Sequence, residues 1–187
     1  MKFWTVQSPE VLEIIEKEDI YHPKFVMSQY YKQYSELYNF MLESFNNING
    51  LNCDGLIYAF CISNKDVIYP IANIEGFKYF INMNKDKISY LWDTFIKNGC
   101  KILELEMGLV FNDLALAFND FQYIMPSPVN ELLFDPVEYQ TNCKLILSNI
   151  KNGIIMSSGE NYDLIQSHLP YIKKLDIKNV YEIFSLT

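Results

Sequence analysis

The sequence predicts an α+β fold, in which a small mixed or antiparallel sheet packs against several helices. Three observations lead to this prediction. Residues 101–107 alternate strictly between apolar and acidic side chains, which is the period of two of a half-buried strand. Residues 56–62 form a continuous apolar run, as a buried central strand does. Between about 24 and 48, apolar side chains recur at three- and four-residue steps, which indicates one long amphipathic helix.

The rest of the chain is organised around the stretch 101–125. Its strand is followed by a second apolar run at 114–118, which is too short for periodicity to decide between strand and helix. Asn119 or Asp120 is suited to cap a following helical turn. Pro126 then closes the stretch, because proline donates no backbone hydrogen bond.

The N-terminal part is predicted to be a strand followed by a short helix. Residues 2–6 have the pattern of a strand. Ser8-Pro9-Glu10 is typical of a helix start, with a capping serine, proline at the first helical position and an acid in the first turn. Pro23 disfavours helical geometry in the residue before it, so 20–23 is expected to be an extended connection.

The clearest helix pattern runs from Tyr30 to Ile48. Its aromatic stripe could line a ligand pocket, but such stripes more often belong to the core. We expect the helix to bury Tyr34, Leu37, Met41 and Phe45.

Six further elements are predicted between residue 67 and the C-terminus. Residues 67–71 form a second strand, which Pro70 places at an edge. Alternating apolar side chains favour a strand at 73–83, and Asp86 is expected to cap a helix that ends at Gly99. Helices are predicted at 136–150 and 162–168, with a final strand at 180–186. No repeat or linker interrupts the chain, so 1–187 is interpreted as a single domain.

The charged residues bound the choice of partner. The net charge is −8, and the chain has fifteen lysines and no arginine. Arginine is the usual bidentate ligand of phosphate and guanine, so nucleic acid is not expected as a partner. An A+T-rich genome, in which lysine replaces arginine generally, would also explain its absence, but the chemical consequence is the same.

No membrane, metal or cofactor partner is expected. No apolar run reaches the roughly 18 residues of a membrane span. The N-terminus turns polar too early for a signal peptide, so we expect a cytoplasmic protein whose four cysteines are mostly buried thiols. Neither the cysteines nor the two histidines have metal-ligand spacing, and the common nucleotide-binding and nucleophile motifs are missing.

Four segments carry a resemblance to a known family. They are the opening Phe3 to Gln7, the aromatic Tyr58 to Phe60, the stretch Leu114 to Ile124, and the closing part from Ile165 to Phe184. In these segments the chain resembles a bacterial family of unknown function, domain-of-unknown-function family 3841. That family has no established activity, so the resemblance implies no catalytic residue. It directs attention to six candidate binding residues: Trp4, Thr5, Gln7, Asp120, Tyr123 and Gln166.

These candidates sit at or beside the ends of predicted elements, where a rigid scaffold can hold functional groups. We expect at least three of Trp4, Gln7, Asp120, Tyr123 and Gln166 to converge on one concave surface. The alternative is that the large aromatics simply pack in the core.

Two charged groups have simpler interpretations beside the functional ones. Glu104 and Glu106 could share acid–base work or hold a cation, but such pairs are more often the solvated face of an edge strand. The basic cluster of Lys173, Lys174 and Lys178 is interpreted as a solvated helix end.

Two functions remain compatible with the sequence. The first is a non-enzymatic module that binds a small molecule or a protein. The second is an enzyme similar to the ADP-ribosyltransferases, acting on a nucleotide cofactor, which only an analogy of element order supports. The enzyme would require Thr5 or Gln7 to lie near Gln166 or Glu182 around a pocket.

Overall fold

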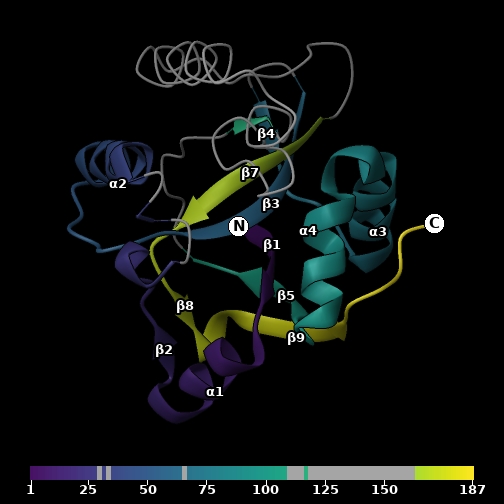
Figure 1. Cartoon of the computed structure of the whole chain (residues 1–187), viewed down its shortest axis with the longest axis horizontal. Helices are drawn as coiled ribbons and strands as arrows, with labels where there is room; N and C mark the ends of the chain where they lie inside the picture. The colour runs from purple at the N-terminus through teal and green to yellow at the C-terminus, as the bar shows by residue number, and fades with distance from the viewer. Residues whose placement is uncertain (29–30, 33–34, 65–66, 109–115, 118–162) are drawn as a thin grey trace.

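The computed structural model describes residues 1–28, 31–32, 35–64, 67–108, 116–117 and 163–187, and the statements below concern these residues. Their fold is α+β. The main sheet has seven strands in the order β6-β7-β3-β1-β5-β9, with β4 paired to β3, and every pairing is antiparallel (Figure 1). Its strands are β1 (Lys2–Gln7), β3 (Ile57–Asn64), β4 (Val67–Tyr69), β5 (Lys101–Glu106), β6 (Leu116–Ala117), β7 (Asp163–Leu169) and β9 (Ile177–Glu182).

The described helices flank this sheet. They are α1 (Pro9–Glu18), α2 (Ser35–Asn49), α3 (Ile74–Met83) and α4 (Lys85–Lys97), with short 3-10 helices at Phe25–Met27 and Lys174–Asp176. A small second sheet pairs β2 (Ile20–Tyr21) with β8 (Ile172–Lys173). In Figure 1, α3 and α4 lie side by side, with α1 and α2 apart from them.

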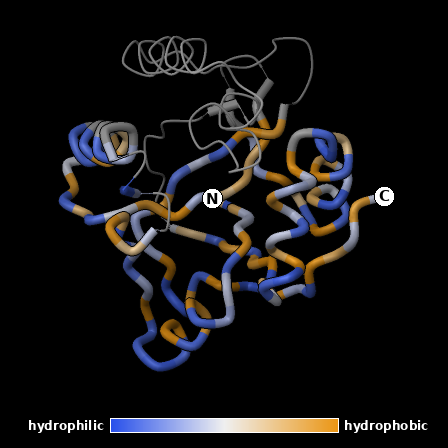
Figure 2. Tube along the Cα trace, viewed as in Figure 1, coloured by the Kyte–Doolittle hydropathy of each residue, from blue (hydrophilic) through white to orange (hydrophobic). Residues whose placement is uncertain are grey.

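Both faces of the main sheet are covered. One face packs Phe3, Leu103 and Leu105 against Ile15 of α1. The other face packs Trp4, Phe60 and Ile102 against α3 and α4, through four buried side chains: Phe77, Ile81, Ile88 and Trp92. We call these the α1 face and the α3/α4 face. Unlike these two buried faces, the turn between α1 and β2 is hydrophilic (Figure 2).

Several elements predicted from sequence are confirmed. β1 and β5 coincide with the predicted strands, and β3 is the buried central strand expected from its apolar run. Ser8 and Pro9 begin α1 as expected, and Gly99, with a φ of 63°, follows α4 in the left-handed conformation that favours glycine. The 114–118 run, for which periodicity could not decide between strand and helix, contains the strand β6.

One prediction about β5 is wrong. This strand is not half-buried, because Ile102 and Glu104 on its second face are 0% and 6% exposed. The helices α3 and α4 cover that face, so only Glu106 of the two glutamates reaches solvent. The strict alternation correctly predicted a strand, but it did not predict that helices cover the second face of that strand.

The long helix predicted for about 24–48 is shorter in the structure. Lys24 and Ser28 have extended backbone on either side of the 3-10 helix Phe25–Met27, and α2 begins at Ser35. The predicted apolar face is present in α2, where Met41 and Phe45 are buried. Tyr34 and the side chain of Leu37 lie outside the described residues, so their predicted burial stays a prediction.

The strand predicted at 73–83 is a helix, α3. The side chain of Asn73 caps it by accepting a hydrogen bond from the backbone N–H of Gly76 at 2.9 Å. Phe77 and Ile81, four residues apart, are buried, whereas Tyr79 and Met83 are exposed. The apparent alternation therefore concealed a helical period.

The short helix predicted at 162–168 is a strand, β7, which pairs with β3 through seven residue pairs. Its residues from Leu164 to Leu169 are all buried, so long-range pairing decided a segment whose local pattern was ambiguous.

Smaller corrections concern the element ends. The final strand runs over 177–182 rather than 180–186, because the chain then leaves the sheet and the Phe184 carbonyl accepts a hydrogen bond from the indole of Trp92. The cap position of α4 is Asn84, and Asp86 lies in the first turn. The predicted helix at 136–150 lies outside the described residues.

The buried face of α2 gives a first test. Phe45 is 0% exposed, so Phe45→Ala should lower the free energy of unfolding by about 3–5 kcal/mol. Glu43→Ala, at an exposed position of the same helix, is the control and should change it by less than about 0.5 kcal/mol. Urea unfolding followed by circular dichroism measures both, and equal values for the two variants would contradict this assignment of the face.

Candidate functional site

The described candidate residues divide between the two faces of the sheet. Side chains alternate along a strand, so Trp4 lies on the α3/α4 face, while Thr5 is on the other face and Gln7 shares its side. Gln166 pairs with Phe60, whose neighbour across β1 is Trp4, so Gln166 also lies on the α3/α4 face. Trp4 and Gln166 thus share a face that Thr5 and Gln7 do not. Asp120 and Tyr123 lie outside the described residues.

Trp4 is a core residue. It is 0% exposed, and its indole N–H donates to the Ile71 carbonyl at 2.9 Å. Its ring stacks on Phe77 at 5.1 Å and on Tyr181 at 5.9 Å between centroids. Packing and hydrogen bonding together account for this side chain, as the alternative interpretation of the aromatic candidates expected.

Thr5 and Gln7 form a short hydrogen-bonded chain. The Thr5 hydroxyl donates to the Tyr58 carbonyl at 2.6 Å, and the Gln7 amide N–H donates to the Thr5 hydroxyl oxygen at 2.7 Å. These hydrogen bonds join β1 to β3, so both side chains have a structural role in the sheet.

Gln166 differs from the other three described candidates. It is 2% exposed, and neither its amide nitrogen nor its amide oxygen has a hydrogen-bond partner among the residues that the structure describes. An unpaired polar group buried in a protein costs about 1–3 kcal/mol, so a native structure rarely keeps one without a reason. The Gln166 amide is therefore the strongest candidate for a ligand-binding group.

The surroundings of Gln166 on this face are largely aromatic. Phe60 stands beside it on β3, and one step along the strands Tyr58 pairs with His168. The rings of Tyr58 and His168 meet edge to face, with centroids 5.5 Å apart. Removal from solvent, reinforced by the Tyr38 hydroxyl, raises the pKa of Tyr58 well above its ordinary value, so its phenol stays protonated at neutral pH.

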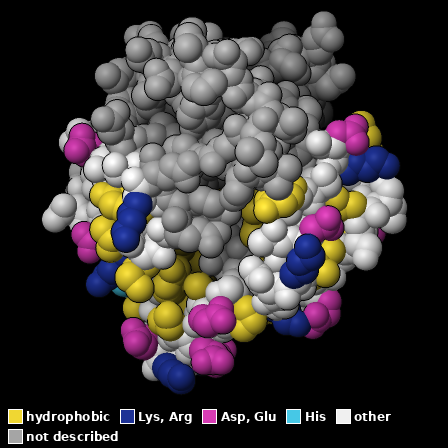
Figure 3. Space-filling view, in the orientation of Figure 1, with side chains coloured by type: hydrophobic (Ala, Val, Ile, Leu, Met, Phe, Trp, Pro, Cys, Tyr) yellow, Lys and Arg dark blue, Asp and Glu magenta, His cyan; other side chains and the backbone are white. Residues whose placement is uncertain are grey.

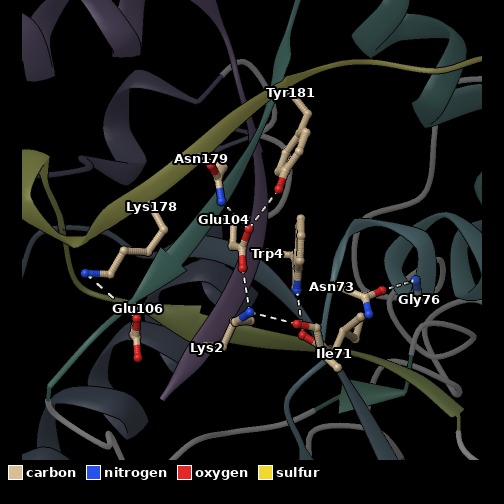
Figure 4. Close-up of polar contacts among 11 residues, drawn as sticks. Lys2, Trp4, Ile71, Asn73, Gly76, Glu104, Glu106, Lys178, Asn179 and Tyr181 are labelled. Carbon is tan, nitrogen blue, oxygen red and sulfur yellow. Dashed lines mark hydrogen bonds and ion pairs between the residues drawn. The ribbon is translucent and has the colours of Figure 1, made fainter.

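A second polar group on the same face, Glu104, is fully paired (Figure 4). One carboxylate oxygen meets the Lys2 ammonium at 2.5 Å. The other accepts from the Asn179 amide at 2.8 Å and from the Tyr181 hydroxyl at 3.0 Å. Lys2 also donates to the Ala72 carbonyl, so this network ties β1, β5 and β9 to the segment before α3.

This network corrects the interpretation of Glu104 and Glu106. β5 lies between β1 and β9, so it is not an edge strand, and Glu104 is buried. Glu106 is exposed and has a separate partner, Lys178, at 3.8 Å. Within the described part of the chain, no group of three or more histidine, cysteine or acidic side chains is placed to hold a metal ion.

The environment of Glu104 shifts its pKa. Burial alone would raise it, but hydrogen bonds from Lys2, Asn179 and Tyr181, with the charge of Lys2, outweigh burial and lower the pKa below its ordinary value. Glu104 is thus ionised and structural at neutral pH.

The basic cluster is also corrected. Lys173 belongs to β8 and lies over the Tyr171 ring, 5.0 Å from its centroid, and Lys174 pairs with Glu16 of α1 at 2.7 Å. The three lysines therefore do not form a solvated helix end.

Sequence reasoning missed both the Glu104 network and the aromatic neighbours of Gln166 as features of a site. Asn179 and Tyr181 meet Glu104 only through the register of β5 with β9. The only sequence signal for the Glu104 network was the spacing of Asn179 and Tyr181, which puts both side chains on one face of the last strand.

Comparisons of the chain with protein-family models, with curated proteins and with solved structures found no match. Membership of the family of unknown function therefore stays a prediction that rests on the four quoted segments. None of the helices in the described ranges is long and apolar enough to span a membrane.

The unpaired amide of Gln166 gives the second test. Gln166→Met keeps the size of the side chain and removes both unpaired groups, so it should raise the free energy of unfolding by about 1–3 kcal/mol. Gln7→Met is the matched control, because it removes an amide that is hydrogen-bonded, and should lower the value by about 0.5–1.5 kcal/mol. Urea unfolding of the ligand-free protein measures both. A loss of stability in Gln166→Met equal to that in Gln7→Met would mean that the amide is engaged.

The lowered pKa of Glu104 gives the third test. Its stabilising contribution is present above the unfolded pKa of about 4.3 and is lost as the pH falls through the lower folded pKa. Glu104→Gln should therefore reduce stability at pH 7 by more than it does in acid. Glu106→Gln, which alters an exposed pair, should change stability by less than about 0.5 kcal/mol at either pH. Urea unfolding across this pH range decides, and a Glu104→Gln effect independent of pH would refute the linkage.

Proposed function

We propose that this chain is a non-enzymatic binding module that recognises a small molecule through the buried amide of Gln166. One observation carries the proposal: both polar atoms of that amide are buried on the α3/α4 face and have no hydrogen-bond partner in the described part of the chain. The free energy lost in leaving them unpaired would be recovered when a ligand hydrogen-bonds to them.

The burial of Gln166 favours a small molecule over a protein as the ligand. A protein partner reaches exposed groups, whereas small-molecule sites enclose most of the ligand and place a few polar groups among apolar ones. A 2% exposed amide beside Phe60 fits the second description. A protein-binding role is therefore the weaker form of the proposal.

The alternative, an enzyme similar to the ADP-ribosyltransferases, has less support. It needs Thr5 or Gln7 to share a pocket with Gln166 or Glu182. Thr5 and Gln7 lie on the face opposite Gln166, and the Glu182 side chain is 83% exposed and paired with Lys101. A carboxylate so open to water is not the shielded group that such chemistry would use.

The charge distribution supports a ligand other than nucleic acid. On the face in Figure 3, lysine side chains are scattered among acidic ones, and the net charge of the chain is −8. Several lysines are already paired, among them Lys78 with Glu75 and Lys174 with Glu16. Nucleic-acid affinity depends on a gathered basic surface that can displace counterions.

The proposal is tested by a ligand screen on three forms of the protein. Wild type, Gln166→Met and the control Gln7→Met are screened against one library of polar fragments by saturation-transfer NMR. We expect some fragments to bind wild type and Gln7→Met but not Gln166→Met. The proposal fails if no fragment binds wild type, or if the same fragments bind Gln166→Met equally well.

A further inference from the structure

The Gln166 amide also constrains the chemistry of its ligand, and this inference rests on the proposed function. We propose that the ligand is an uncharged planar carboxamide or heterocycle whose edge presents a hydrogen-bond donor beside an acceptor. Three features of the site lead to this class. They are the donor and the acceptor of the amide, which both need a partner, the aromatic and aliphatic side chains beside it, and the charges that are missing around it.

The first feature is the amide itself. A glutamine side chain offers one N–H₂ donor and one carbonyl acceptor on the same planar group. Both atoms of Gln166 are unpaired, so a ligand with only an acceptor, or only a donor, would leave one of them unpaired in the complex. A ligand edge with both groups side by side satisfies the two atoms at once, as an adenine edge does with a glutamine in nucleic-acid recognition.

The second feature is the shape of the neighbouring side chains. Phe60 is paired with Gln166 across β3 and β7, and the edge-to-face rings of Tyr58 and His168 are the next pair along. On the other side, the pair of Ile62 and Leu164 adds aliphatic surface. Aromatic and aliphatic walls on either side of a polar group favour a flat, apolar-faced ligand over a flexible polar one.

The third feature is charge. The described side chains beside or diagonal to Gln166 on this face are Tyr58, Phe60, Ile62, Leu164 and His168, and none of them is a carboxylate or a lysine. The chain contains no arginine to form a bidentate bond with a phosphate or carboxylate, and its net charge of −8 repels anions. A buried cation on the ligand would find no carboxylate among these groups, and an anion would find neither arginine nor lysine, so an uncharged ligand fits best.

Three probe pairs test the class by isothermal titration calorimetry on the wild-type chain. They are adenosine with N6,N6-dimethyladenosine, uridine with N3-methyluridine, and benzamide with N,N-dimethylbenzamide. Each methylated member keeps the ring and the acceptor and loses the donor. We expect at least one parent compound to bind, and its methylated partner to bind at least about tenfold more weakly. In Gln166→Met the difference between the two members should disappear.

Each other result has a defined meaning. Equal binding of parent and methylated compounds would overturn the inference, because the protein would then not recognise the donor–acceptor edge of the ligand. If none of the six probes binds while the fragment screen yields ligands of another class, the ligand class is wrong and the binding module stands. A screen without any ligand removes both. The wild-type comparison within each pair needs no variant, so it decides even if Gln166→Met does not fold.

Discussion

Strand β1 lies between β3 and β5 with a layer of protein on each face, so the polar groups buried on it have to be paired inside the molecule. Trp4 meets this constraint by donating to the Ile71 carbonyl, and Thr5 by donating to the Tyr58 carbonyl. Lys2 does so at the end of the strand by reaching both Glu104 and the Ala72 carbonyl. The bonds of Trp4 and Lys2 reach the segment before α3 and so anchor the α3/α4 layer on the sheet.

The strand register brings two buried polar groups into one transverse row. Gln166, Phe60, Trp4, Glu104 and Asn179 follow one another across β7, β3, β1, β5 and β9. At one end, Glu104 is charged and has three partners, which is how a buried carboxylate is normally kept. At the other end, Gln166 is neutral and has no partner within the described ranges. The same face thus holds a completed network and an incomplete one, and the incomplete one is where binding is proposed.

The local sequence predicted elements whose burial determines their apolar pattern. It did not predict elements whose conformation depends on pairing with distant strands. The apolar run of β3 was sufficient, because a strand covered on both faces selects such side chains. The alternation of β5 identified a strand but not its burial on both faces. For α3, the exposed Tyr79 and Met83 imitated a strand and hid the buried pair Phe77 and Ile81. β7 could not be identified, because its state depends on pairing with β3 far away in the sequence. Likewise, Gln166 could be selected as a candidate, but whether its amide finds a partner depends on register and packing.

The order of the strands has a consequence for synthesis of the chain. The two central strands β1 and β3 are made early, whereas β7 and β9, which pair with β3 and β5, come near the end. Contacts that complete the fold span long stretches of sequence, 77 residues from Glu104 to Tyr181 and 102 from Lys85 to Thr187. Such distant contacts slow folding, and during that delay the edge of β3 that belongs to β7 stays open to wrong partners. A nascent chain of this protein therefore leaves that edge of β3 unpaired until β7 has been synthesised.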